Sequence, residues 1–345
     1  MKNRRNTILL VAGTAMFAAA AAPASADAVS DFYKNKTVTV QVPSSLGATL
    51  GLYGRLVVDH FGKHVPGSPN VVIESRPGAG GAVGAAYAFN VAPKDGTYVS
   101  EVLSAIIVDA IIRPGAKFNA AKFQWIGSVA TRPAVVSVWA ATTPAKTLAD
   151  AEKIQVIMGS SGKSSETYMI PTLMNALLGT KFKVVLGYKG GAEINQAMEQ
   201  GEIHGRMQYW SGWTAGKPDW LRDNKLIHFV QYGPVIKDIP NVPRLADLVK
   251  EAKHKQMVSL MEASNHVGMG FWAPPGVPKD RVTALRNAFA SMLRDEAFLA
   301  TAKKLQAPVE PMNGVELQKI VEDAYATPPA VVDELRKIVA GEGKS

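Results

Sequence analysis

Strand-length apolar runs alternate with amphipathic segments along most of this 345-residue chain, and the alternation restricts the folds open to it. Thr37–Val42, Val71–Glu74 and Tyr98–Leu103 are runs of this kind, and segments with helical spacing separate them. The pattern continues from Val135–Ala140 to Leu226–Gln231. Strands that alternate with helices are typical of α/β folds with largely parallel sheets. Because the chain is longer than one average domain, we expect two such α/β lobes.

The first residues have the composition of an export signal. Lys2, Arg4 and Arg5 form a basic region, an apolar stretch follows over residues 8–22, and Ala24-Ser25-Ala26 provides a small-residue cleavage site. We expect residues 1–26 to be a signal peptide and the mature protein to reside in the periplasm. No later apolar run is long and uncharged enough to span a bilayer, which predicts a soluble product.

The two lobes are expected to interleave along the chain. Residues 27–134 and 233–345 are assigned to lobe 1, and residues 135–232 to lobe 2. A lobe built from both sides of the other implies two hinge strands, an arrangement that suits closure around a ligand. The C-terminal region is interpreted as structural and helical, and we expect the protein to be a monomer.

Charge and cysteine content narrow the function. The formal net charge of +9 becomes +6 (9 − 3) once Lys2, Arg4 and Arg5 are removed. A positive balance favours anionic small ligands, whereas the scattered distribution of lysine and arginine argues against nucleic acid. The chain contains no cysteine, which excludes disulfides, thiolate metal sites and cysteine nucleophiles.

Motifs for cofactors and metals are incomplete. A phosphate-binding loop ending at Gly162 would need glycine at Ile157, and the last glycine of Gly78–Gly84 comes one place late for a dinucleotide fingerprint. His60 and His64 are four residues apart, but no third metal ligand follows nearby. We therefore expect no cofactor, no metal and no enzymatic activity.

Two short turns rich in glycine and serine follow predicted strands, one in each lobe. Each pattern predicts a strand, a tight turn and a helix start, which leaves N–H groups and hydroxyls facing one spot. Either turn alone is also typical of an ordinary strand-to-helix connection, but the pair predicts capture of an anion from both sides. The candidate contacts are Ser44, Ser45, Gly47, Ala48 and Thr49 in the first turn, and Ser160, Ser161, Lys163 and Ser165 in the second.

Further candidates flank these turns. Ser104 ends the third predicted strand and is expected at the same cleft edge, and Tyr188 follows a strand of lobe 2. His204 stands at a strand start that we place near the cleft. Trp210 and Ser211 follow the same strand; the aromatic cluster there fits a core or a cleft wall equally well.

A series of short motifs resembles one protein family across essentially the whole mature chain. The chain is similar to the periplasmic substrate-binding proteins of tripartite tricarboxylate transporters, also called Bug proteins. The motifs are Val42-Pro43, Tyr53-Gly54-Arg55, Arg76-Pro77-Gly78-Ala79-Gly80-Gly81, Ala92-Pro93-Lys94-Asp95-Gly96-Thr97, Gly159-Ser160-Ser161-Gly162, Tyr188-Lys189-Gly190-Gly191, Gln200-Gly201-Glu202, Pro240-Asn241-Val242-Pro243 and Ala273-Pro274-Pro275-Gly276-Val277-Pro278.

The resemblance implies a fold and a function. It implies a two-lobed Venus-flytrap fold of the type II periplasmic class, with two hinge-linked α/β domains. It also implies capture of a carboxylated solute, such as a dicarboxylate, a tricarboxylate or an aromatic carboxylate, between the two turns. Membrane permease subunits would be the partners in uptake. A ligand-sensing partner of a membrane sensor kinase remains an alternative, and an exported serine hydrolase with His204 as its base is a second.

The sequence departs from the family pattern at positions that affect charge. Gly51 replaces an acidic residue common early in the helix after the first turn, and His204 replaces a usual aspartate. Lys163 stands where the family commonly has a small residue. A more positive cleft predicts a ligand with at least one ionised carboxylate, and disfavours an amino acid whose ammonium needs an acidic partner.

Overall fold

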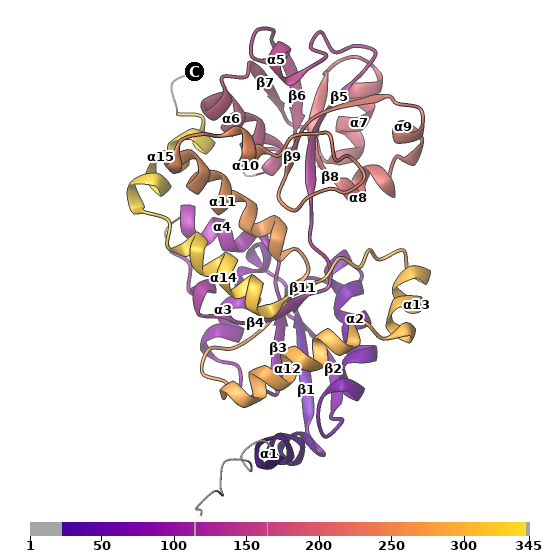
Figure 1. Cartoon of the computed structure of the whole chain (residues 1–345), viewed down its shortest axis with the longest axis vertical. Coiled ribbons are helices and arrows are strands. Elements are labelled where there is room, and N and C mark those ends of the chain that lie inside the picture. The colour runs from indigo at the N-terminus through magenta and orange to yellow at the C-terminus, as the bar shows by residue number, and fades with distance from the viewer. Residues whose placement is uncertain (1–22, 114, 164, 343–345) are drawn as a thin grey trace, which may run out of the picture.

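Two β-sheets organise the structure, a computed structural model that describes residues 23–113, 115–163 and 165–342 (Figure 1). The sheet of lobe 1 has the spatial order β11 (Met312–Asn313), β4 (Gln124–Ser128), β10 (Gly270–Ala273), β3 (Tyr98–Glu101), β1 (Thr37–Val42) and β2 (Asn70–Ser75). The sheet of lobe 2 has the order β7 (Phe182–Leu186), β6 (Val156–Ser160), β8 (Gly205–Tyr209), β5 (Ala134–Trp139) and β9 (Leu226–Tyr232).

Helices cover both sheets and also connect them. Those beside the first sheet are α1 (Pro23–Tyr33), α2 (Thr49–Phe61), α3 (Ala82–Asn90), α4 (Ala105–Ile112), α12 (Lys279–Met292), α13 (Glu296–Lys304) and α14 (Gly314–Tyr325). Those of the upper lobe are α5 (Leu148–Ala151), α6 (Glu166–Leu178), α7 (Gly191–Glu199), α8 (Trp210–Thr214) and α9 (Pro218–Arg222). The remaining helices are α10 (Leu245–Leu248), α11 (Ala252–Val267) and α15 (Pro329–Ala340). The expected α/β class with two lobes is confirmed.

Both sheets are mixed, so the expectation of largely parallel sheets is wrong. β1 pairs parallel with β2 and β3, and β6 pairs parallel with β7 and β8. β10 is antiparallel to both of its neighbours, and so is β5. The reason lies in the connections: β5 and β10 receive the chain from the other lobe. They therefore run opposite to strands that follow a local helical crossover.

The strand directions make one edge of each sheet face the other lobe. In lobe 1, β10 is antiparallel to both β3 and β4, so the carboxyl ends of β1, β3 and β4 share an edge. The chain leaves that edge at Ser128 and enters lobe 2 at Ala134. Ala134 pairs with Tyr209 at the end of β8, and β6 runs parallel to β8. The carboxyl ends of β6 and β8 thus point toward lobe 1.

The chain passes between the lobes three times, one more than the two hinge strands expected. The first link joins β4 to β5, the second leads from β9 through α10 and α11 to β10, and the third joins α14 to α15. α15 packs against α6 and α4, on the upper left of Figure 1. Its apolar face, with Leu335 and Val339, joins the core of lobe 2, so this part of 233–345 does not lie with lobe 1.

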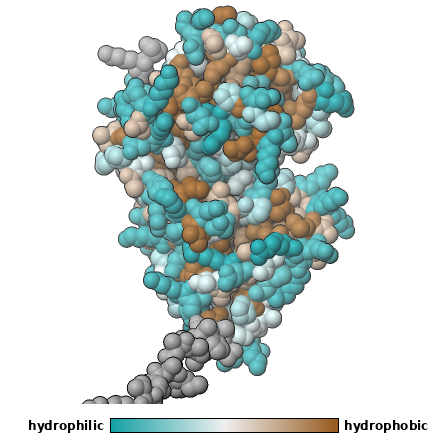
Figure 2. Space-filling model, in the orientation of Figure 1, coloured by the Kyte–Doolittle hydropathy of each residue, from teal (hydrophilic) through white to brown (hydrophobic). Residues whose placement is uncertain are grey.

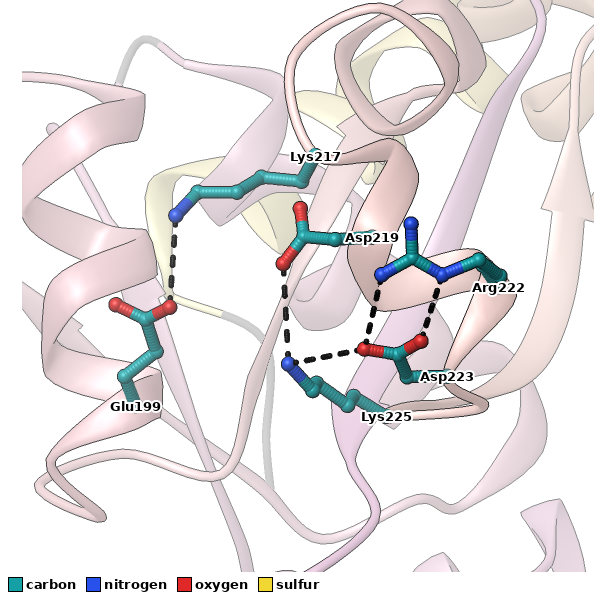
Figure 3. A network of polar contacts seen from close by, with 6 residues as sticks. All are labelled: Glu199, Lys217, Asp219, Arg222, Asp223 and Lys225. Carbon is teal, nitrogen blue, oxygen red and sulfur yellow. Dashed lines mark hydrogen bonds and ion pairs between the residues drawn. The ribbon is translucent and has the colours of Figure 1, made fainter.

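The segment after β8 carries a surface network of charges (Figure 3). Lys217 reaches Glu199 at 3.4 Å, and Lys225 lies 3.5 Å from Asp223 and 3.7 Å from Asp219. All of these groups are accessible to solvent, so the pairs contribute little stability. Packing beneath them holds the segment more firmly, because the rings of Trp213 and Trp220 are both buried and lie 5.6 Å apart.

None of the described helices is long and apolar enough to cross a membrane. Residues 1–22 of the predicted signal peptide lie outside the described residues, and α1 begins at Pro23.

Candidate functional site

The first glycine–serine turn, at Ser44–Thr49, lies at the carboxyl end of β1, on the edge that faces lobe 2. Its backbone is held from outside, because the Ser75 hydroxyl donates to the Ser44 carbonyl at 2.8 Å. Arg55 donates to the Leu46 carbonyl at 3.1 Å. Ala48 is the N-cap of α2 and offers no side-chain acceptor to the first N–H groups of that helix. These N–H groups are therefore available to an external acceptor, as an anion site requires.

The second turn, between β6 and α6, contains a chain of three hydroxyls. The Oγ of Ser160 lies 2.8 Å from the Oγ1 of Thr167, which lies 2.7 Å from the Oγ of Ser165. Ser165 is the N-cap of α6 and accepts from the Thr167 N–H. Ser160 is fully buried and also bonds to Gly162, so it shapes the turn from inside. Hydroxyl hydrogens can reorient along such a chain, which leaves Ser165 able to donate outward.

The other predicted turn residues lie at the same edges. Ser45, Gly47 and Thr49 are exposed in the first turn, and Ser161 and Lys163 are exposed in the second. A Cβ atom added at Gly47 would meet no atom within 4 Å, so the space beside it is open. Ser104 is the buried N-cap of α4, and its hydroxyl makes no capping hydrogen bond.

A cavity of about 1020 Å³ lies between the lobes next to the second turn. It includes Ser165, Glu166 and Tyr209 from lobe 2, and its other wall comes from α4 and the start of α3. Residues of α11 and the interlobe residue Arg132 complete it. The first turn lies close by, because a Cβ on the cavity neighbour Gly81 would sit 3.4 Å from Pro43. Figure 2 shows the surface indented between the upper and lower halves, on the right.

Four polar side chains of this cavity escaped the sequence analysis: Arg132, Glu166, Tyr209 and Ser264. The Glu166 carboxylate accepts from the Tyr209 hydroxyl at 2.9 Å and from the Ser264 hydroxyl at 3.0 Å. Burial raises the pKa of Glu166, while these hydrogen bonds and the nearby Arg132 oppose the rise. The guanidinium of Arg132 stacks on the Tyr209 ring, 3.7 Å from its centroid. No sequence motif marks these residues, since four separate segments supply them.

The aromatic candidates point into lobe 2. The Tyr188 hydroxyl donates to Glu202 at 2.6 Å, and the Trp210 indole donates to Asp238 at 2.7 Å. Trp210 and Trp213 are both buried in one apolar cluster, and Ser211 between them is exposed. Of the two interpretations left open for this aromatic cluster, the structure favours the core.

His204 does not lie near the cleft, and that expectation is corrected. It precedes Gly205, the first residue of β8, whereas Tyr209 at the other end of the strand faces lobe 1. Its Nδ1 accepts from the backbone N–H of Ile157 at 3.0 Å, and burial lowers its pKa. A strand start and a strand end occupy opposite edges of a sheet, so His204 is remote from both turns.

Comparison with known proteins places this geometry in context. A family model described as "Tripartite tricarboxylate transporter family receptor" matches residues 55–336. No curated protein sequence matches the chain.

Several solved structures share the fold. A TctC solute-binding protein from Polaromonas, solved without ligand, is 19% identical; the alignment covers 90% of this chain and 99% of that one, with a TM-score of 0.69. The periplasmic binding protein BugD is 19% identical over 89% and 98% of the two chains, with a TM-score of 0.52. A Rhodopseudomonas palustris protein solved with adipate is 20% identical over 88% and 97%, with a TM-score of 0.55.

Proposed function

We propose that this chain, which belongs to the tripartite tricarboxylate transporter receptor family, is a monomeric periplasmic protein that captures a small carboxylate between its lobes and delivers it to membrane permease subunits. The observation that carries the proposal is the position of the two glycine–serine turns at strand ends that face each other across the interlobe space. The first turn presents uncapped N–H groups, and the second presents the Ser165 hydroxyl.

The chemistry of the turns suits an ionised carboxylate. Hydrogen bonds to a charged acceptor contribute roughly 1.5–3 kcal/mol each, and a helix N-terminus adds about 0.3–1 kcal/mol. Four or five such contacts, reduced by the cost of ordering, reach the ~8 kcal/mol that a micromolar dissociation constant requires. Contacts to both turns form together only when the lobes are close, so the ligand favours the closed arrangement. Ser45, Gly47, Thr49, Ser161 and Lys163 are the exposed residues proposed to participate.

Two alternatives differ in their output. A sensing partner of a membrane kinase would use the same binding physics, and permease or kinase genes beside this one would separate the two roles. A serine hydrolase needs a base within hydrogen-bond reach of its serine. His204 lies at the far edge of the sheet, and the Ser137–His228 pair, 2.8 Å apart, sits on paired strands with Ser137 fully buried. A substrate has no access to that serine.

A thermal-shift screen tests the proposal. Malate, adipate, citrate, benzoate and octanoate are compared with the corresponding amides, with amines and with neutral sugars. We expect carboxylates to raise the melting temperature, because a ligand that binds only the folded state stabilises it by mass action. Stabilisation by amides or sugars, with none by any carboxylate, would contradict the proposed chemistry.

Point variants then locate the ligand. Ser45→Ala and Ser165→Ala should each weaken the best carboxylate about tenfold, since each removes one donor to a charged group. Ser291→Ala, on the exposed surface of α12, is the matched control and should leave affinity unchanged. Unaltered affinity in both turn variants would move the site away from the turns.

A further inference from the structure

The interlobe cavity holds one cation that lacks a protein partner. Among the residues that the structure describes, no hydrogen bond and no ion pair within 4.0 Å engages the Arg132 guanidinium, although it lines the cavity. Its backbone is fixed, because its N–H donates to the Asn265 carbonyl at 2.8 Å and its carbonyl accepts from the Asn265 side chain at 2.9 Å. Stacking on Tyr209 at 3.7 Å holds the guanidinium plane as well.

Glu166 leaves the donors of Arg132 free. Both carboxylate oxygens of Glu166 are already used, one by the Tyr209 hydroxyl and one by the Ser264 hydroxyl. Tyr209 is thereby fixed beneath the guanidinium. A planar guanidinium that is held on one face and carries unused N–H groups matches the two oxygens of a carboxylate. The Ser165 hydroxyl lines the same cavity and can donate to the same anion.

The opposite wall of the cavity is apolar. Its residues include Ala82, Val83 and Ala86 of α3, and Ile106, Val108 and Ile112 of α4. Val83 is 47% exposed, a large accessible fraction for an aliphatic side chain that faces a cavity. With a volume of about 1020 Å³, the cavity is at the upper end of the range for small-molecule sites, ~300–1,000 Å³. A four-carbon diacid would leave this wall in contact with water.

From these contacts we propose that the preferred ligand is an amphipathic monocarboxylate, whose carboxylate pairs with Arg132 and whose apolar body covers the wall formed by α3 and α4. The inference rests on the proposed function and specifies its substrate class. The apolar wall offers a second carboxylate no donor, and Glu166 beside Arg132 disfavours another negative charge at that end. Arg132 is therefore the residue that sets specificity for the anion, and the wall sets specificity for the rest of the ligand.

Octanoate is a suitable probe, because it joins one carboxylate to a flexible apolar tail. Octanamide removes the charge at constant size, and octanedioate adds a second carboxylate at the same chain length. Titration calorimetry on the mature protein should show octanoate binding at least about tenfold more tightly than either analogue. Equal or tighter binding of octanedioate would overturn the assignment to a monocarboxylate.

Paired arginine variants test the anion contact. Arg132→Gln should weaken octanoate about 10- to 100-fold, whereas Arg113→Gln should not. Arg113 lines the same cavity but is already paired with Asp109 at 2.7 Å, so it is the matched control. If Arg132→Gln fails to fold, Arg132→Lys, which keeps the charge and loses the planar fork, should show a smaller loss. Unchanged affinity in a folded Arg132 variant, or a loss confined to Arg113→Gln, would overturn the role of Arg132.

A substitution in the apolar wall tests the second contact. Val83→Asn is accessible to solvent and should fold, and it should weaken octanoate about 3- to 10-fold while sparing acetate. Equal weakening of both, or of neither, would contradict burial of the tail there. The screen with malate and adipate separates the two proposals: if these diacids bind and octanoate does not, the amphipathic ligand is wrong while carboxylate capture stands. If no carboxylate binds, both proposals fail.

Discussion

Among single residues, Glu101 has the most unfavourable surroundings. It is 1% exposed at the end of β3, and neither carboxylate oxygen has a hydrogen-bond partner among the described residues. Burial raises the pKa of Glu101 well above its ordinary value of 4.5. Glu262, which is also buried, accepts from the Gly233 N–H at 2.9 Å and lies 4.0 Å from Arg244; burial raises its pKa to about 7. Glu101 has no such compensation, so its neutral form is the one that folding favours.

The sign of the pH dependence follows from this. Below pH 4.5 Glu101 is protonated in the folded and unfolded states alike, and it contributes no pH dependence. Above that pH the unfolded chain loses the proton while the folded protein keeps it, so stability falls as pH rises, by up to about 1.4 kcal/mol per pH unit. Glu101→Gln cannot ionise. Its stability relative to the original protein should therefore increase with pH.

Urea unfolding at several values between about pH 5 and 8 measures this difference. Glu316→Gln, an exposed residue in the first turn of α14, is the control and should track the original protein at every pH. A difference between Glu101→Gln and the original protein that stays constant across the range would show that Glu101 is ionised in the folded state.

Among elements, α2 positions the first turn by lying very close to β1. A Cβ atom on Gly54 would sit 2.2 Å from a methyl group of Val42, so glycine is required for this approach. Gly54→Ala should destabilise the protein: alanine favours the helix by about 1 kcal/mol, but overpacking costs about 1–3 kcal/mol and shifts α2. Because α2 begins at Thr49, its shift should also weaken carboxylate binding. Thermal unfolding and calorimetry measure the two effects.

Gly212→Ala in α8 is the matched control for this prediction. Its added Cβ would meet only the end of the Gln208 side chain, at 2.5 Å, and that side chain can move. We expect little change in its melting temperature. Similar losses in both variants would show that the effect comes from glycine replacement in general and not from the contact between α2 and β1.

The sequence predicted local elements well and assembled sites poorly. The strand Thr37–Val42 has the predicted bounds, because alternating β-branched residues between polar flanks leave few alternatives. The turn at Gly159–Ser165 was also found, since strand, turn and helix cap are contiguous. β10 and α11 were missed: β10 is four residues long, and the buried face of α11 includes Glu262, Ser264 and Asn265. Arg132 and Glu166 meet only through tertiary packing, which periodicity does not encode.

At the scale of the whole molecule, one core joins the lobes behind the cavity. Val108 and Ile112 of α4 belong to the same apolar cluster as the strands of lobe 2, and so do residues of α11. α15 completes this cluster, with Leu335 fully buried in it. The cavity is therefore walled on one side by a packed helical layer that spans both lobes. Closure on a ligand must move the lobes about this layer, which limits where they can bend.

A shared core also predicts that the lobes lose stability together. Leu335→Ala should cost about 2–5 kcal/mol, because it leaves a cavity in a fully packed cluster. Although α15 packs on α6 of lobe 2, the cluster includes α4 of lobe 1, so hydrogen exchange should accelerate in β1 as well as in β6. Val315→Ala, an exposed position on α14, should change neither strand. If Leu335→Ala exposed β6 alone, the lobes would be independent units, and closure would depend only on the three connecting segments.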